Sequence, residues 1–167
     1  MLHRDAFSPE MAWLPDCTLS GMREPSEARK RTLALRERAL TFSNNVNQSY
    51  PADGMNYPSE VVWNQLVRAA DSTSNNLAEA GGGISDADFL YKMRVVLREA
   101  KESYVCLVKI RRGPLANAQR VLALGLEQEA DELSAIFSTI ITNTERRIER
   151  EKAQATEEQR RRQRNGR

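Results

Sequence analysis

Apolar residues recur at steps of three and four along three separate stretches of the sequence, and this pattern limits the fold more than any other feature. Such steps match the α-helical turn of about 3.6 residues and place the apolar side chains on one face. The pattern is clearest in the stretch that ends at Ala80, where its members are Val62, Leu66, Ala69, Thr73, Leu77 and Ala80. The sequence therefore predicts amphipathic helices and an all-α fold.

Turn-forming residues divide this pattern into four predicted helices. Serines are the expected N-caps of the first three, because a serine side chain accepts a hydrogen bond from the first turn. Glycine and proline end the second and third helices. The predicted helices span residues 27–46, 59–80 and 86–112, with a fourth that begins near 117 and continues past 144, and the expected caps are Ser26, Ser59 and Ser85 or Asp86.

The expected stripe of the third helix is Phe89, Met93, Val96, Ala100, Tyr104 and Leu107. That of the fourth is Leu126, Ala130, Leu133, Phe137, Ile140 and Thr144.

The first and fourth helices have the least regular patterns. Leu33, Leu40 and Val46 form the main apolar stripe of the first helix, with further apolar residues beside it. We therefore expect Leu33 and Leu40 to face the core. Gly125 interrupts the fourth pattern, because glycine weakens a helix. It predicts a kink, or a short separate turn over residues 115–124.

Four amphipathic helices joined by short loops pack most simply as an antiparallel up-down four-helix bundle. We expect this bundle to be one domain of residues 26–150. Residues 1–25 contain three prolines and no sustained periodicity, so we expect an irregular arm, although Trp13 and Leu14 could dock on the bundle. Residues 151–167 are expected to form a charged, arginine-rich tail that is either an exposed helix or disordered.

The sequence offers little of the chemistry on which enzymes depend. Its one histidine is His3, and its two cysteines, Cys17 and Cys106, lie far apart, which disfavours histidine-based catalysis and most metal sites. Carboxylates from different helices could still converge on two metals, but the Glu-x-x-His pair typical of such bundles is missing. The three glycines after Ala80 lack the strand and the GKS or GKT of a phosphate-binding loop. We expect no enzyme activity, no metal and no cofactor.

The expected location is the cytoplasm. No apolar run approaches the roughly 20 residues that a membrane span requires. The first residues hold acids and prolines where an export signal would need an apolar stretch. We therefore expect no contact with a membrane.

Positive charge is concentrated on one face of the third predicted helix. At about 100° per residue, its cations fall within an arc of about 80°, opposite the apolar stripe. A rigid outward row of cations suits a phosphate backbone, because the release of condensed counterions drives such binding. The alternative is an ordinary solvated helix face. The residues assigned to nucleic-acid binding here are Arg94, Arg98, Lys101, Lys109 and Arg112.

The C-terminal segment suggests the same partner. Residues 145–167 hold nine basic and five acidic residues, a local net charge of +4. An arginine-rich tail can embrace nucleic acid and become ordered on contact, although a solubilising or disordered end is the alternative. The tail has no aromatic residue, so it gives no basis for base-specific recognition. The tail residues assigned to nucleic-acid binding are Arg160, Arg161, Arg162 and Arg164.

The second predicted helix has an apolar arc of about 160° once Trp63, Val67 and Ala70 are included, whereas a monomeric bundle needs a stripe somewhat above 100°. This excess predicts either contact with a neighbouring subunit or a well-buried central helix. A second, polar stripe on the same helix is assigned to a subunit interface, and its members are Arg68, Ser72, Asn75 and Glu79.

The segment QLVRAADSTSNNLAEA, residues 65–80, resembles the signature of the bacterial four-helix-bundle family known as the 23S rRNA-intervening-sequence proteins. That family shows Gln-Leu-x-Arg-Ala-Ala-x-Ser followed by Asn-Ile-Ala-Glu-Gly. This chain has Ala80 where the family has glycine, although Gly81 follows at once. Residues 88–112 are similar to the family's third helix, and the resemblance covers roughly residues 28–145. The matching positions are Gln65, Leu66, Arg68, Ala69, Ala70, Ser72, Asn76, Leu77, Ala78 and Glu79.

This family includes the accessory variability proteins of diversity-generating retroelements. The resemblance implies a ring-like homo-oligomer, a pentamer, that binds a reverse transcriptase and nucleic acid without catalysis of its own. We therefore expect a non-catalytic accessory protein whose partners are RNA or DNA and, in this branch, a reverse transcriptase. The alternative is an oligomeric protein–protein interaction scaffold without a nucleic-acid role, which the wide apolar arc of the second helix favours.

Overall fold

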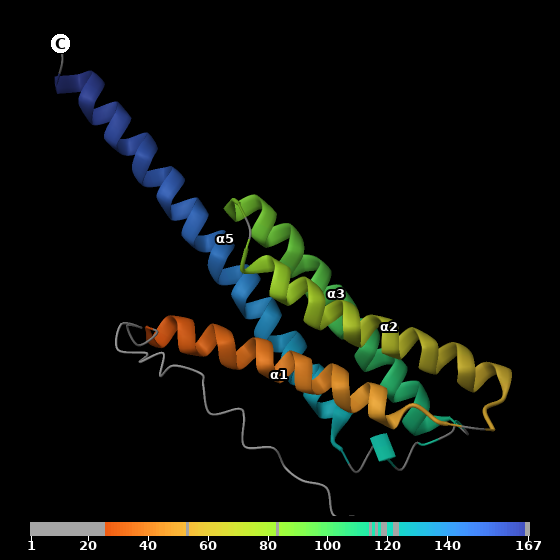
Figure 1. Ribbon diagram of the computed structural model, residues 1–167. Coiled ribbons are helices and arrows are strands. Elements are labelled where there is room, and N and C mark those ends of the chain that lie inside the picture. Colours follow the sequence, from red (N-terminus) through yellow and green to blue (C-terminus); the bar gives the residue numbers. More distant parts are fainter. Residues whose placement is uncertain are drawn as a thin grey trace, which may run out of the picture.

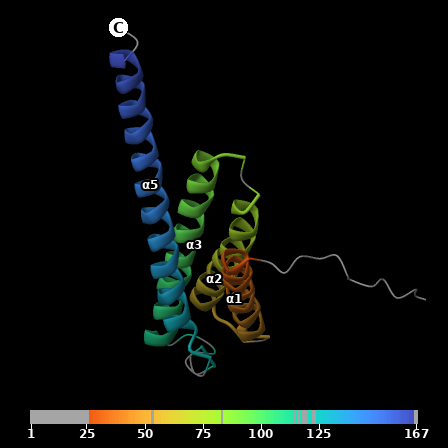
Figure 2. The same ribbon diagram turned by 90° about the vertical axis from the view of Figure 1, so that its left-hand side faces the viewer.

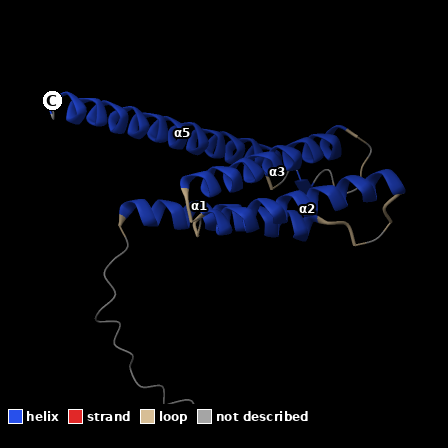
Figure 3. Cartoon of the chain, turned by 90° about the horizontal axis from the view of Figure 1, so that it is seen from above, coloured by secondary structure: helices blue, strands red, loops and turns tan. Residues whose placement is uncertain are grey.

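The computed structural model describes residues 26–52, 54–82, 84–113, 115, 117, 120–121 and 124–165. These residues form four long α-helices, which are α1 (Glu27–Ser49), α2 (Tyr57–Ala80), α3 (Asp86–Arg112) and α5 (Leu126–Asn165) (Figure 1). No strand occurs among the described residues (Figure 3). The helices pack against one another as a four-helix bundle, so the predicted all-α fold is confirmed. The ring-like assembly concerns further copies of the chain and stays a prediction.

Side-chain pairs between helices show that neighbouring helices run antiparallel. Between α2 and α3, Gln65 Nε2 donates to Glu102 Oε1 at 2.6 Å. On the same two helices, Lys92 Nζ pairs with Glu79 Oε2 at 2.5 Å, so residue numbers rise along α2 as they fall along α3. The equivalent pairs between α3 and α5 are Arg94 with Glu145 and Arg111 with Glu127. The bundle is therefore up-down.

Polar contacts attach α1 to both of its neighbours. Arg38 Nε donates to Glu129 Oε1 on α5 at 2.6 Å, and its Nη2 donates to Glu132 Oε2 at 2.5 Å. The hydrogen bond to Glu129 is the largest cause that raises the pKa of Arg38. On the other side of α1, the hydroxyl of Ser43 donates to the carboxylate of Asp71 on α2. These contacts hold α1 against both α5 and α2.

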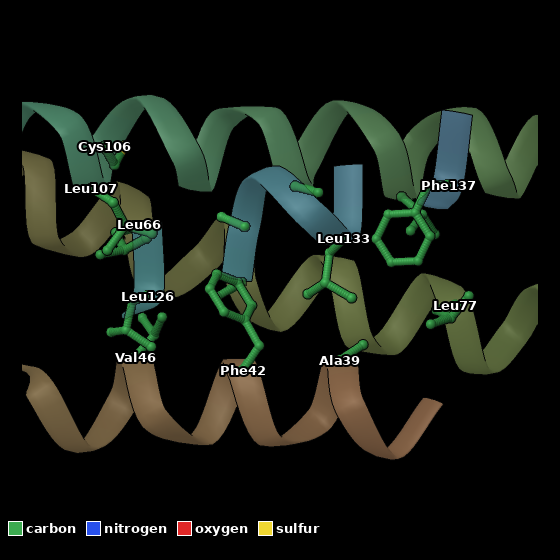
Figure 4. Close-up of a cluster of buried hydrophobic side chains, with 14 of the residues drawn as sticks. Ala39, Phe42, Val46, Leu66, Leu77, Cys106, Leu107, Leu126, Leu133 and Phe137 are labelled. Atoms are coloured by element: carbon green, nitrogen blue, oxygen red, sulfur yellow. The ribbon is translucent and has the colours of Figure 1, made fainter. Parts of the chain in front are cut away.

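All four helices contribute to one hydrophobic core. Phe42 of α1, Trp63 of α2 and Phe137 of α5 are each at most 1% exposed. Figure 4 shows Phe42, Leu133 and Phe137 in the space between the helices. Burial of one such side chain contributes roughly 1.5–3 kcal/mol relative to exposure. Tyr50 packs edge-on against Trp63, with the ring centroids 6.1 Å apart. The predicted stripes of the second, third and fourth helices supply most of this core.

The expectation that Leu33 and Leu40 face the core is wrong, since these side chains are 47% and 46% exposed. α1 buries Val46, as expected, together with Ala39 and Phe42, and these three follow one another at steps of three and four. Leu33 and Leu40 share a face because they are seven residues apart, but that face points away from the core. α1 carries two apolar stripes, and only one of them packs against α2 and α5.

The beginnings of two helices differ from the prediction. α2 begins earlier because Asn56, rather than Ser59, is its N-cap, and the Asn56 side chain accepts a hydrogen bond from the Ser59 backbone N–H at 3.0 Å. Pro58 fits the first turn, where a backbone N–H would have no helical partner. α5 begins at Leu126, directly after Gly125, whose φ of +61° glycine adopts without a Cβ clash. The predicted caps that are confirmed are Ser26 and Ser85.

α5 is longer than the bundle that supports it. Ile148 is the last of its residues that packs against the core, and residues 149–165 are exposed throughout. We call residues 149–165 the free end of α5; its length is about 25 Å. Figures 1 and 2 show this segment extending beyond α3. The C-terminal tail, expected either as an exposed helix or as disordered, is thus helical as far as Asn165.

The arm expected for residues 1–25, with His3 and Cys17, lies outside the described residues. None of the helices in the described part of the chain is long and apolar enough to cross a membrane.

Candidate nucleic-acid interface

The five cations predicted to share one side of α3 are all exposed, because the opposite side of the helix packs into the core. Met93, Val96 and Leu107 are at most 1% exposed on that inner side. Two further exposed residues, Tyr91 and Val105, fall in or beside the same arc of the helix. We call this surface the α3 outer face, and it consists of Tyr91, Arg94, Arg98, Lys101, Val105, Lys109 and Arg112.

Two cations of the α3 outer face have acidic partners. Arg94 Nη2 lies 2.6 Å from Glu145 Oε1 on α5, and Arg98 Nη2 lies 2.7 Å from Glu99 Oε1 on α3 itself. The hydrogen bond to Glu99 is the main cause that raises the pKa of Arg98. Both arginines stay open to solvent, with 60% and 71% of their side chains exposed. Exposed ion pairs of this kind are weak, so phosphates can compete for both guanidinium groups.

The other three cations, Lys101, Lys109 and Arg112, are exposed and form no ion pair with any described residue. Lys109 and Arg112 occupy the last turn of α3, where the helix dipole favours positive charge. From Lys101 to Arg112 the helix rises about 16 Å. The α3 outer face therefore keeps three cations outside any ion pair, on a helix that the bundle holds in place.

Sequence reasoning missed Tyr91. Its side chain is 64% exposed, and it precedes Arg94 by three residues on the same side of α3. The signal was available, because a helical wheel places Tyr91 at the edge of the cationic arc.

The tail arginines assigned to nucleic-acid binding lie at the last turns of α5, where each is exposed: Arg160, Arg161, Arg162 and Arg164. Arg161 Nε pairs with Glu157 Oε1 at 3.1 Å, one turn earlier on the helix. The other three form no ion pair within the described chain. At about 100° per residue, the four side chains spread over about 200° of the helix circumference, unlike the narrow row on α3.

The separation of the two sets of cations depends on which α3 cation is considered. Arg94 pairs with Glu145, from which α5 rises about 22 Å to Arg160. Arg111, next to Arg112, pairs with Glu127 at the start of α5, with Arg111 Nε 2.5 Å from Glu127 Oε2. From Glu127 to Arg162 the continuous helix rises about 50 Å. A ligand that contacts both Arg112 and Arg162 must therefore be extended, which suits a polynucleotide better than a small anion.

The polar stripe assigned to a subunit interface lies on the outer side of α2, and none of its members is buried: Arg68, Ser72, Asn75 and Glu79. Two members have partners within the chain. Glu79 pairs with Lys92 of α3, and Ser72 accepts hydrogen bonds from Asn76 Nδ2 through its hydroxyl and its backbone oxygen. An interface role for these residues stays a prediction.

The other two members of the stripe face different grooves. Arg68 lies beside Arg98 in the groove between α2 and α3, and Asn75 lies in the groove between α1 and α2. The wide apolar arc of α2, which suggested a subunit interface, packs within the chain's own bundle, since Trp63 and Ala70 are both 0% exposed. Of the two readings left open by the sequence, the buried central helix accounts for this arc.

Cys106 is buried in the core, and burial is the main cause that raises the pKa of its thiol. No cluster of three or more histidine, cysteine or acidic residues that could hold a metal ion occurs among the described residues.

No family model matches the sequence, and no curated protein matches it. Among solved structures, the fold is similar to that of a protein of unknown function from the S23 ribosomal protein family of Bacteroides thetaiotaomicron, with a TM-score of 0.51 and 20% sequence identity. The similarity covers 67% of this chain and 98% of that chain. At this identity the likeness shows a shared fold, and it fits the four-helix family that residues 65–80 resemble.

Proposed function

We propose that this protein is a non-catalytic accessory protein that binds nucleic acid through the α3 outer face and the free end of α5. One observation carries the proposal: Lys101, Lys109 and Arg112 are exposed, lie along one rigid helix and form no ion pair in the described part of the chain. A phosphate backbone that contacts such a line releases its condensed counterions, and this release drives binding.

The placement of the tail arginines supports a long ligand. Arg160, Arg162 and Arg164 add further unpaired charge at the free end of α5, about 50 Å from Arg112. An RNA or DNA strand that follows α3 and α5 can contact both regions at once. Linked contacts of this kind raise affinity through effective concentration.

A more specific role rests on the sequence resemblance. If the chain belongs to the branch of accessory variability proteins, it assembles as a homopentamer and assists a reverse transcriptase in a diversity-generating retroelement. The resemblance of residues 65–80 supports this role, and the similar solved structure supports the fold alone. A neighbouring reverse-transcriptase gene with a template repeat would support this branch, and light scattering would test the subunit number.

The binding proposal is tested by measuring affinity for labelled RNA and DNA over a range of salt concentrations. The wild-type logarithm of affinity should fall linearly with the logarithm of salt concentration. A variant with Lys101→Gln and Lys109→Gln should bind more weakly. Its slope should be shallower by roughly 1.5, since each lost phosphate contact removes about 0.7–0.9.

A matched control removes two exposed arginines from α1, with Arg29→Gln and Arg31→Gln. This variant has the same net charge as the α3 variant but an unchanged α3 outer face. Equal losses in the two variants would mean that overall charge, and not this face, attracts the ligand. Absence of binding at low salt would refute nucleic-acid binding itself.

A second candidate function is a protein–protein interaction scaffold, which one observation favours. Leu33 and Leu40 are nearly half exposed along a groove of about 500 Å³ between α1 and α2. This function predicts a pull-down that survives nuclease treatment and is lost with Leu33→Asn and Leu40→Asn. A pull-down that nuclease abolishes would favour the nucleic-acid role.

A further inference from the structure

No contact with a described residue explains the position of Tyr91 on the α3 outer face. The protein has four tyrosines, and two of them support the fold. Tyr50 packs against Trp63 and donates its hydroxyl to Asn64 at 2.9 Å, and Tyr104 packs against the core. Tyr91 is 64% exposed and makes no hydrogen bond or ring contact with any described residue.

Two arginines follow Tyr91 on the same side of α3. Arg94 follows it after about 4.5 Å of helix rise, and Arg98 follows after about 10 Å on the same side. An exposed ring therefore stands at one end of a row of phosphate-binding side chains.

An aromatic ring at the end of a row of cations suits an unpaired base. Proteins that bind single strands combine a positive track for the backbone with aromatic rings on which bases stack. Bases inside a duplex are already stacked and paired, so their faces are closed to such a ring. The cations alone would accept either form of nucleic acid, whereas the ring favours a strand with open bases.

We infer that the α3 outer face binds single-stranded RNA or DNA, with one base stacked on Tyr91 and the adjoining phosphates on Arg94, Arg98 and Lys101. This inference rests on the proposed nucleic-acid binding and narrows it to a substrate class. Tyr91 would contribute without a charge, so its effect is separable from that of the cations.

The test compares the full chain with Tyr91→Ala, Tyr91→Phe and Tyr57→Ala, using one labelled oligonucleotide as a single strand and as a duplex with its complement. Tyr57 is a matched control because it is 78% exposed but lies at the start of α2. Tyr91→Ala should weaken single-strand binding by roughly five- to a hundredfold, the range expected for one lost stacking contact. Tyr91→Phe and Tyr57→Ala should bind close to wild type.

The salt dependence provides the second readout. Tyr91→Ala should leave the slope of affinity against salt unchanged, because the variant removes no charge. Its duplex binding should also be unchanged. The inference is overturned if Tyr91→Ala binds the single strand as well as Tyr57→Ala does, if it loses duplex affinity equally, or if Tyr91→Phe is as weak. A wild-type chain that binds neither form would instead refute the proposed function.

Discussion

The α3 outer face and the free end of α5 carry similar charge but differ in what holds their side chains in place. α3 packs between α2 and α5, and its inner residues Met93 and Leu107 are at most 1% exposed. The free end of α5 has no buried residue among residues 149–165. The spacing of the α3 cations is therefore fixed by the core, whereas the spacing of the α5 arginines depends on local helix stability.

This difference predicts two modes of binding. Side chains on a rigid helix lose less conformational freedom on contact, which favours affinity. The free end can bend or fray, and it must be ordered when it binds. In its last turns Glu157 and Glu158 precede the four arginines, as in the Glu157–Arg161 pair, an order that suits the helix dipole and supports a helix without a packed face.

The largest expected effect is a difference in unfolding free energy between a substitution in the part of α5 that packs in the core and one in its free end. Phe137→Ala removes a fully buried ring from the core and should lower the free energy of unfolding by about 3–5 kcal/mol. Ala155→Gly in the free end should change the free energy of global unfolding by about 0.5 kcal/mol or less. Urea denaturation followed by circular dichroism measures both values. Comparable losses would show that the free end is part of the cooperative unit.

The next effect concerns ligand length. Oligonucleotides that extend over about 50 Å should bind more tightly than those of about 15 Å, because only the longer ones can contact both cationic regions. Replacing Arg160, Arg162 and Arg164 with glutamine should remove this gain and leave the affinity for the short ligand nearly unchanged. Titration of both oligonucleotide lengths with the wild-type protein and with the variant tests this. A loss of affinity that is equal for the two lengths would contradict two separate contact regions.

The smallest effect concerns the ion pair that joins α3 to the start of α5. The pKa of Glu127 is lowered, first by its hydrogen bond from Arg111. A lowered pKa in the folded state stabilises the fold above the ordinary value of 4.5, and this contribution is lost as the pH falls through the lowered pKa. Arg111→Gln should therefore destabilise the protein slightly at pH near 7.

Urea denaturation at two pH values tests this contribution. The difference between wild type and Arg111→Gln should disappear well below pH 4.5, once Glu127 is protonated. Arg161→Gln breaks a comparable pair in the free end of α5 and should leave the global stability unchanged at either pH. An effect of Arg161→Gln equal to that of Arg111→Gln would contradict the distinction between the two regions.

Most of the fold could be predicted from the residue pattern. In α2 and α3 one apolar stripe dominates, so only one face of each helix can be buried. Residues such as Leu66 and Val96 lie in the core as expected. α1 carries two stripes, and periodicity alone cannot say which one meets α2 and α5. Leu33 and Leu40 were assigned to the core for that reason.

The side of α3 that the cations occupy could be predicted from the sequence, but the acidic residues that pair with them could not. A helical wheel places Arg94 and Lys101 on the outer side of α3 once the inner side is known. It cannot show that Arg94 meets Glu145, since this acid comes from another helix, 51 residues away. Nor can it show that the wide arc of α2 is filled by its own bundle, as the burial of Trp63 demonstrates.

The salt dependence of nucleic-acid affinity tests the central claim most directly. Three unpaired cations on the α3 outer face predict that the logarithm of affinity falls with the logarithm of salt concentration with a slope of about −2 or steeper. Binding that is absent at low salt, or that does not change with salt, would contradict the account.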